Sequence, residues 1–332
     1  MAPSRVCVAR WSPARDWKSA SLLLLFAFGL IIAPDFRLKA EATRSLKDTT
    51  ERTRGFRLQA EGHLRVSRTS FIKPDGSAFH WRGITAFRLL EFVAHGREAE
   101  ANAYLKWAAS KKLTLVRVLG MADGLFKLAP ADGLRALPRL LEMAQRHGLY
   151  VELVALADTA TIALDFPRHV KAVAEICARH PNVLLEIANE PVHPTQARAL
   201  HDPAYVTSLA QLVPAGIPVS LGSVENGDAF GAGTYVTWHA PRGRDWPRQI
   251  GEQGAALLRK FGKPVISDEP MGAADKAVAG RRDSDPARFR ASAQASARAG
   301  LGATFHYEGG LQARLPTRTE RACLDAWING LR

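Results

Sequence analysis

Hydrophobic runs of five to seven residues alternate with amphipathic stretches along the chain from residue 81 onward. The runs are rich in Val, Ile and Leu, which is typical of strands buried on both faces of a parallel sheet. The stretches between them repeat apolar residues every three to four positions, as helices do. Candidate strands cover residues 81–87, 113–119, 150–156, 183–188, 218–222, 235–239, 264–268 and 303–307, and candidate helices cover 98–109, 134–147, 168–179, 205–212, 248–261, 286–299 and 320–331. Eight strands in this order predict a single α/β domain, the (β/α)8 TIM barrel.

Two other features of the pattern concern the connections. Gly148 and Gly262 each follow a helical stretch and stand shortly before a strand, where glycine commonly ends a helix. The link at residues 223–234 is rich in glycine, so we expect little helix there.

Two β-rich arms precede the first strand, at residues 65–81, with an Asp75-Gly76 turn between them. This pattern predicts a β-hairpin, which we place across the bottom of the barrel. A doubly wound open sheet is the competing architecture, and a division into two small domains also fits the length of 332 residues. The chain has no Gly-rich phosphate-binding loop after its first strand, which disfavours the open sheet.

The first 62 residues differ in character from the rest. Basic residues at positions 5, 10, 15 and 18 precede an uncharged apolar run at residues 20–33, which is the length of a signal-peptide core. Residues 1–42 are therefore predicted to be a signal peptide or an amino-terminal membrane anchor, followed by a linker at 43–62 and the barrel at 63–332. We expect a secreted or periplasmic protein, with attachment to the inner membrane through residues 20–33 if the segment is not cleaved.

The net charge of +13 raises the question of a nucleic-acid partner. Residues 1–70 hold 13 Lys and Arg against 6 Asp and Glu, so about half of the excess belongs to the leader and linker. The remaining positive charge is dispersed without an aromatic-interleaved basic patch, and we predict no nucleic-acid binding. The hydrophobic share of 47% is too high for a disordered chain.

Three cysteines are too few for a disulfide framework. Cys7 lies in the predicted leader, and Cys177 and Cys323 each lie in a helical pattern, so we expect buried free thiols. Neither has a histidine at metal-ligand spacing, and the sequence predicts no metal and no organic cofactor.

Two of the candidate strands end in a glutamate followed by proline. Strand four leads into Asn189-Glu190-Pro191, and strand seven leads into Asp268-Glu269-Pro270. The carboxyl ends of barrel strands form the active-site face, and strands four and seven lie across the mouth from each other. Two carboxyl groups about 5 Å apart there can hydrolyse a glycosidic bond with retention of configuration.

The sequence resembles the clan A glycoside hydrolases, especially the cellulase and mannanase group called family 5, from about Arg65 to the carboxyl terminus. The motif Leu185-Glu186-Ile187-Ala188-Asn189-Glu190-Pro191 matches the strand-four end that carries the acid/base of that clan. Ile266-Ser267-Asp268-Glu269 is similar to the strand-seven end that carries the nucleophile. The resemblance implies a glycosidase acting on an oligosaccharide or polysaccharide, with Glu190 as acid/base and Glu269 as nucleophile.

The same resemblance implies roles for three further residues. Arg117 matches the strand-two arginine that hydrogen-bonds the nucleophile, and Asn189 matches the residue that binds the sugar 2-hydroxyl. His239 lies where the clan often has a strand-six His or Tyr near the nucleophile. Glu186 has the strand parity of Glu190, so we expect it to point into the barrel and pair with a barrel arginine.

The chain departs from the family at two strand ends. Strand eight ends in Phe305-His306-Tyr307 where the family usually has a tryptophan, so Tyr307, with Trp238 and Trp246 as further candidates, is predicted to supply the aromatic platform for a sugar ring. Strand three ends in Asp158 without the histidine of many family members, and Asp158 is a candidate substitute.

In the implied reaction Glu269 attacks the anomeric carbon while Glu190 protonates the leaving oxygen, which requires a raised pKa for Glu190. A carbohydrate-binding pseudoenzyme and a transglycosylase on the same barrel are the alternatives. A metal-dependent hydrolase is disfavoured because His239 and His306 are the histidines at the strand ends.

Overall fold

The computed structural model describes residues 62–276 and 281–332. Eight parallel strands form the central sheet of this part of the chain, in the spatial order β8-β7-β6-β5-β4-β13-β10-β9. Their bounds are β4 Arg82–Thr85, β5 Leu115–Leu119, β6 Tyr150–Leu156, β7 Val183–Ala188, β8 Val219–Ser220, β9 Val236–His239, β10 Val265–Asp268 and β13 Gly302–Phe305. All eight coincide with predicted strands, and the TIM barrel is confirmed. The predicted leader, and the linker up to its last residue, lie outside the described residues.

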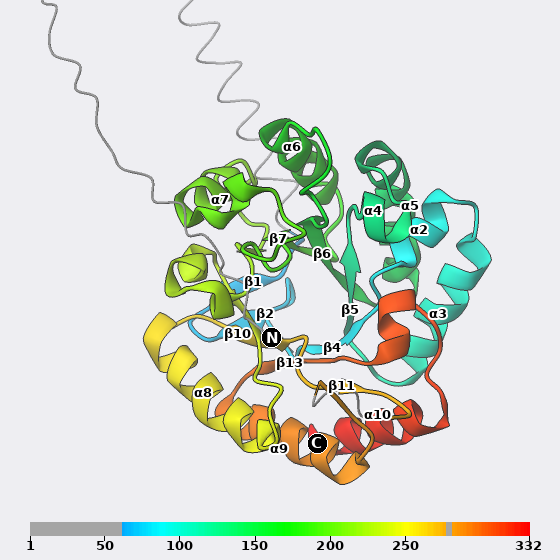
Figure 1. Cartoon of the computed structure of the whole chain (residues 1–332), viewed down its shortest axis with the longest axis vertical. Coiled ribbons are helices and arrows are strands. Elements are labelled where there is room, and N and C mark those ends of the chain that lie inside the picture. Colours follow the sequence, from blue (N-terminus) through cyan, green and yellow to red (C-terminus); the bar gives the residue numbers. More distant parts are fainter. Residues whose placement is uncertain (1–61, 277–280) are drawn as a thin grey trace, which may run out of the picture. The chain divides into compact units, whose positions relative to one another are not determined.

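The barrel closes between its fifth and sixth strands, β8 and β9. A parallel bridge joins Ser223 to Thr237, and the Ser220 Oγ lies 2.9 Å from the Thr237 Oγ1. This backbone bridge and the contact between the two hydroxyl groups close the barrel where β8 is too short to form a long ladder. Figure 1 shows the helices as a ring around the strands.

The helices of this ring agree with the predicted amphipathic stretches. They are α3 Glu98–Ser110, α5 Pro130–Arg146, α6 Phe166–Cys177, α7 Pro203–Ala210, α8 Trp246–Phe261, α9 Pro286–Ala299 and α10 Arg318–Gly330. The Gly-rich link after β8 contains 3-10 turns, η2 Val224–Asn226 and η3 Asp228–Ala232, as its composition predicts. The sequence reasoning did not identify the short helices α2 Leu89–Ala94 and α4 Asp123–Phe126, nor the strand pair β11 Gly272–Ala273 and β12 Arg282–Asp283.

A shared sequence device starts several of these helices. Asp165, Asp202 and Asp285 cap α6, α7 and α9 by accepting a hydrogen bond from a backbone N–H of the first turn, and a proline follows within the first two helical positions. The carboxylate satisfies a helix N–H that has no partner inside the helix, and proline pre-sets the helical φ where its missing N–H costs nothing. These caps determine where the chain turns from each loop into the outer layer.

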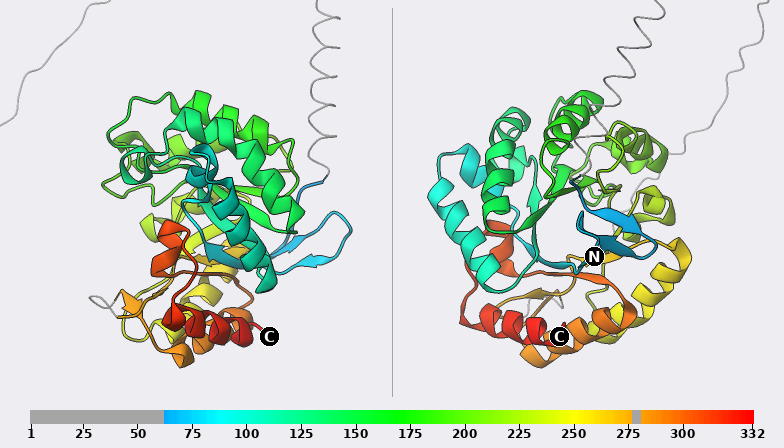
Figure 2. Two further views of the ribbon diagram at one scale, coloured as in Figure 1. Left: turned by 90° about the vertical axis from the view of Figure 1, so that its right-hand side faces the viewer. Right: turned by 180° about the vertical axis from the view of Figure 1, so that it is seen from behind.

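A small antiparallel sheet covers the amino-terminal ends of the strands. It consists of β1 Arg65–Ser67, β2 Ser70–Ile72 and β3 Ala78–Phe79, so the predicted hairpin is a three-stranded meander, with the Asp75-Gly76 turn between β2 and β3. Its buried aromatic residues pack against the lower barrel interior in one cluster, which comprises Leu64, Phe71, Phe79, Trp81, Leu115, Leu184, Tyr235 and Ile266. Figure 2 shows this sheet at one end of the barrel. The bottom of the barrel is therefore sealed by apolar side chains.

Cys177 in α6 and Cys323 in α10 are buried free thiols, as predicted. Across residues 62–276 and 281–332, none of the helices has the length and apolar character that a bilayer crossing requires.

We expect Gly133→Ala to destabilise the barrel, although alanine is normally the better helix former. A Cβ at this position of α5 would lie 2.1 Å from the carbonyl oxygen of Gly120, which is backbone and cannot rotate away. Overpacking of this kind costs about 1–3 kcal/mol or more. Thermal unfolding should show a Tm lower by roughly 2–4 °C for each kcal/mol. Gln145→Ala, at an exposed position of the same helix, is the matched control and should leave the Tm close to that of the wild type; equal Tm values for all three proteins would contradict the prediction.

Candidate active site

Three of the predicted site residues converge at the carboxyl ends of β7, β9 and β10. Glu190, His239 and Glu269 each present a side-chain atom within 4.8 Å of the others. The His239 ring lies between the two glutamates, with its Nδ1 3.2 Å from Glu190 Oε1 and its Nε2 3.7 Å from Glu269 Oε1. Glu190 is partly exposed, whereas His239 and Glu269 are buried. The structure thus forms a compact acid-histidine-acid group at the barrel mouth.

Arg117 lies fully buried beneath this group, in β5. Its Nη1 donates to Glu269 Oε1 at 2.5 Å, and its Nη2 donates to Glu186 Oε2 at 2.8 Å and to Asn189 Oδ1 at 3.0 Å. One planar guanidinium therefore orients the predicted nucleophile and the residue before the predicted acid/base. The expected pairing of Glu186 with a barrel arginine is confirmed, and Arg117 is that arginine.

The charges around Glu269 keep it ionised. Burial by itself would raise the pKa of Glu269, but the charges of His239, Arg117 and Arg242 together hold that pKa well below its usual range. An ionised carboxylate in a desolvated site is a competent nucleophile because few water molecules need to be removed from it before reaction.

Glu190 differs from the prediction. The hydrogen bond from His239 is the largest influence and lowers the pKa of Glu190, and it outweighs burial, which would raise it. Burial lowers the pKa of His239, but the charge of Glu269 and the bond to Glu190 outweigh this and leave that pKa raised. The expected raised pKa of Glu190 in the free protein is therefore corrected: the hydrogen bond with His239 lowers the pKa of Glu190 and raises that of His239, so the two groups titrate together as a pair.

Asn189 is held in place by three hydrogen bonds. Its Oδ1 accepts from Arg117, its backbone N–H donates to the Leu156 carbonyl at 3.0 Å, and its backbone carbonyl accepts from Gln196 Nε2. Gln196 is itself fixed by a 2.7 Å bond from Thr159 Oγ1. The sequence reasoning missed Gln196 and Thr159 because both come from loops and no spacing rule links them to strand four.

The strand ends that carry the carboxylates have an unusual backbone. Glu190, Glu269 and Asp158 have φ values of 43°, 37° and 55°. A residue with a Cβ occupies this left-handed region at a cost of roughly 1–2 kcal/mol. Strain of this kind clusters at functional sites, where the surrounding structure holds it in place.

Gly222 allows the loop after β8 to approach the Glu190-Pro191 turn. A Cβ at Gly222 would lie 2.5 Å from the Ala188 carbonyl oxygen and 2.6 Å from Pro191 Cγ, and its φ is 138°. Glycine is therefore required at this position for the turn that presents Glu190 to be packed closely.

Comparison with solved structures gives matches to the barrel. A candidate glycoside hydrolase from Bacteroides vulgatus matches with a TM-score of 0.58 and 17% identity, over 80% of this chain and 60% of the other. A family 5 glycoside hydrolase from the same organism matches with a TM-score of 0.54 and 15% identity, over 76% of this chain and 64% of the other. A β-glucanase from Saccharophagus degradans, solved in complex with cellotetraose, matches with a TM-score of 0.59 and 11% identity, over 80% and 93%.

The fold is that of family 5 glycoside hydrolases. At identities of 11–17% the likeness is one of architecture, and this chain spans less than two thirds of the length of the two Bacteroides proteins. No family model and no curated protein matches the sequence.

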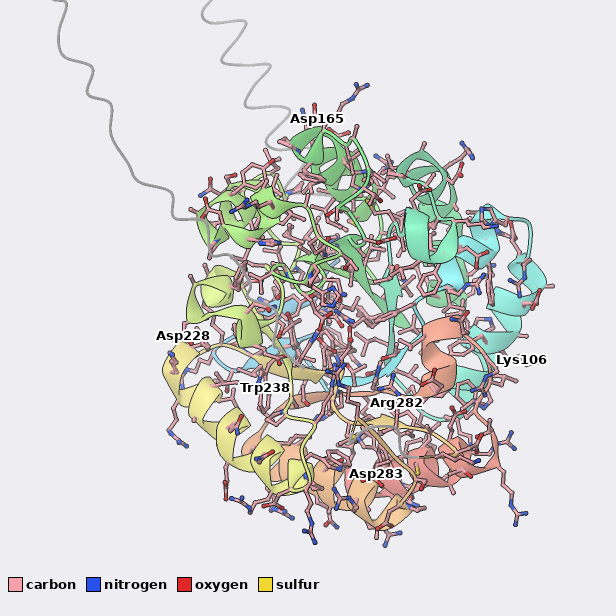
Figure 3. All side chains as sticks on the ribbon, viewed as in Figure 1. Lys106, Asp165, Asp228, Trp238, Arg282 and Asp283 are labelled. Carbon is pink, nitrogen blue, oxygen red and sulfur yellow. The ribbon has the colours of Figure 1, made fainter. Side chains whose placement is uncertain are left out.

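The structure contradicts the predicted aromatic platform for a sugar ring. Tyr307 is fully buried, and its hydroxyl donates to the Arg314 carbonyl and lies 2.8 Å from the Tyr104 hydroxyl. Trp238, labelled in Figure 3, and Trp246 are buried in the main hydrophobic core. Side chains alternate along a strand, so an inward His239 requires an outward Trp238.

The strand-eight and strand-three ends present His306 and Asp158. His306 is buried, its Nδ1 lies 3.0 Å from Thr85 Oγ1, and burial lowers its pKa to about 3, which leaves the ring neutral. Asp158 is half-buried and accepts a hydrogen bond from the Leu125 backbone N–H at 2.8 Å. The Asp158 carboxylate therefore holds the α4 segment.

A second acidic group fills the barrel below the mouth. Glu152, Glu186 and Asp268 are fully buried, with one oxygen of each within 4.8 Å of the others and each with one oxygen that has no hydrogen-bond partner. Burial raises the pKa of Glu152 well above its usual range and raises that of Asp268 to about 6. Protonated carboxyls can supply the missing donors, because an O–H of one group can point to an oxygen of the next.

Among the described residues, two groups bring possible metal ligands within 4.8 Å of one another. One is Glu190, His239 and Glu269 at the mouth, and the other is Glu152, Glu186 and Asp268 below it. Arg117 contacts Glu269 in one group and Glu186 in the other. Its positive charge at the boundary of both groups opposes the binding of a further cation.

Glu152→Gln should raise the stability of the protein, and more so as the pH rises. The folded-state pKa of Glu152 is raised above its unfolded value, so the wild type loses stability as the pH increases through that interval, and glutamine does not ionise. We expect a gain of about 1 kcal/mol or more at pH 8 and a negligible gain near pH 4.5, read from Tm at both pH values. Glu175→Gln, at an exposed position of α6, should show no such pH dependence. A loss of stability at both pH values would show that ionised Glu152 is needed.

Proposed function

We propose that this protein is a retaining glycosidase that cleaves β-glycosidic bonds by double displacement, with Glu269 as nucleophile and Glu190 as acid/base. The observation that supports this best is the spacing of the two glutamates: side-chain oxygens of Glu190 and Glu269 lie within 4.8 Å. Retaining enzymes hold their carboxyl groups about 5–5.5 Å apart, whereas inverting enzymes need about 6.5–9.5 Å to admit a water. The family 5 fold is consistent with this chemistry.

In the first step Glu269 attacks the anomeric carbon, and the bond to the leaving oxygen breaks. We place one proton on the Glu190–His239 pair, at His239 Nδ1. This proton passes to Glu190 Oε1, and Glu190 donates it to the leaving oxygen. In the second step Glu190 accepts a proton from water, which attacks the same carbon and releases Glu269. The pair thus loses one proton and regains one in each cycle.

Asn189 and Arg117 support the transition state in this proposal. Because Asn189 Oδ1 accepts from Arg117, its Nδ2 group is the one to donate to the sugar 2-hydroxyl, a contact that strengthens as the ring flattens. Arg117 stabilises the negative charge that returns to the Glu269 carboxylate when the glycosyl ester breaks down.

The substrate class that we propose is an oligosaccharide or polysaccharide. The basic leader and the apolar run at residues 20–33 support export from the cytoplasm.

Capture of the covalent intermediate by a sugar hydroxyl in place of water would give transglycosylation, and product analysis with added acceptor sugar separates the two outcomes.

Aryl β-glycosides with a good leaving group test the two roles directly. We expect Glu269→Ala to lose measurable activity and Glu190→Ala to lose about 10²–10⁴-fold, because the first removes the nucleophile and the second the general acid and base. Azide should restore turnover to Glu190→Ala and give a β-glycosyl azide, detected by NMR, because azide needs no general base. The matched control is Glu225→Ala, at an exposed position of η2, and it should retain wild-type rates. Activity that survives both site substitutions would reject the assignment.

The pH dependence of kcat/KM tests the shared proton. The rising limb should lie below pH 4.5 because the pKa of Glu269 is lowered, and the falling limb should lie above pH 6.5 because the raised pKa of His239 governs loss of the proton. In His239→Gln the proton resides on Glu190 alone, so we expect the falling limb to move to lower pH. A falling limb that stays in place would show that His239 does not hold the catalytic proton.

A further inference from the structure

Arg242 contacts both the backbone and the side chain of Glu269. It lies in the loop after β9, and its Nε and Nη2 donate to the Glu269 carbonyl oxygen at 3.0 and 2.8 Å. The same Nη2 lies 3.6 Å from Glu269 Oε2. The Arg242 side chain is 28% exposed, which places it at the rim of the site, whereas Arg117 is fully buried.

The backbone at Glu269 needs such a contact. The ladder between β9 and β10 ends with the pair His239 and Asp268, so the Glu269 carbonyl lies beyond the last paired residue. Glu269 has a φ of 37°, in the left-handed region, and Pro270 follows it. Without a partner for its carbonyl, this segment would relax toward a less strained conformation, and the carboxylate would move with it.

The two oxygens of the Glu269 carboxylate have different cationic neighbours. Oε1 accepts from Arg117 Nη1 and lies 3.7 Å from His239 Nε2, while Oε2 faces Arg242. A carboxylate whose two oxygens lie near two different guanidinium groups has one preferred orientation. Loss of Arg242 would leave Oε2 without this neighbour and the backbone without its clamp.

We propose that Arg242 is a positioning residue for the nucleophile: it holds the left-handed backbone of Glu269 and directs its carboxylate toward the anomeric carbon. This inference rests on the proposed function, in which Glu269 is the nucleophile. Arg242 acts through Glu269, so it contributes to the rate of glycosyl transfer and contributes little to substrate affinity.

The decisive variants are Arg242→Gln and Arg242→Lys. Glutamine removes both the charge and the paired Nε and Nη2 donors, whereas lysine keeps the charge alone. For Arg242→Gln we expect kcat with an aryl β-glycoside to fall about 10²-fold, since a displacement of about 1 Å in a reacting group has this effect. KM should change little, and the rising limb of the pH profile should move to higher pH because Glu269 loses a cation. Arg242→Lys should keep the rising limb near its wild-type position and recover part of kcat.

Arg244→Gln is the matched control, because Arg244 is exposed in the same loop. It should match the wild type in kcat, KM and pH profile. Thermal unfolding of each variant verifies that it is folded. An increase in KM for Arg242→Gln, with kcat and the rising limb unchanged, would overturn the proposal and indicate a substrate contact.

Crystal structures of the wild type and Arg242→Gln provide a readout that does not depend on turnover. We expect the variant to show a changed φ at Glu269 and a displaced carboxylate. If the wild type cleaves no glycoside but this displacement occurs, the proposed function fails and the positioning role stands. If glycosides are cleaved and Glu269 stays in place in a variant with wild-type kcat, the positioning role fails and the proposed function stands.

Discussion

The buried guanidinium of Arg117 is the interaction on which the rest of this site depends. It lies at the centre of the barrel, where it bonds Glu186 below, Glu269 above and Asn189 beside it. A charge in this position is stable only when its partners are fixed, because the surrounding strands exclude water. The same bonds that satisfy Arg117 therefore set the orientation of the strand-four and strand-seven ends.

The site combines this rigid centre with strained ends. Glu190 and Glu269 each follow the end of a strand in a left-handed conformation, and a loop side chain holds the backbone at each of them. Gln196 holds the carbonyl next to Glu190, and Arg242 holds the carbonyl of Glu269. Because the strain is balanced by contacts outside the strands, the glutamates can face one another while the barrel below keeps regular geometry.

Electrostatics divides the barrel interior into two zones. At the mouth, the attraction of Glu269 to the neighbouring cations outweighs the cost of burying its charge, and Glu269 stays ionised. Further down, burial is the largest influence on Glu152 and Asp268, and it raises the pKa of both carboxyl groups. Because the raised pKa of Glu152 favours its neutral form, the charge of Arg117 is left to Glu186 and Glu269, the two carboxylates that accept hydrogen bonds from it.

The alternation of apolar runs and amphipathic stretches was enough to predict all eight barrel strands and the main helices, since each βα unit buries its own faces in a local pattern. The two Glu-Pro strand ends were enough to predict that Glu190 and Glu269 lie at the same mouth of the barrel, because the carboxyl ends of parallel strands lie at one edge. The tertiary structure alone decided the aromatic positions, the pKa of Glu190 and the roles of Gln196 and Arg242. These depend on which face of a strand a side chain occupies, and on loop residues 7 and 27 positions away from their partners. Contacts of that kind follow from three-dimensional packing, and no periodicity or spacing in the chain encodes them.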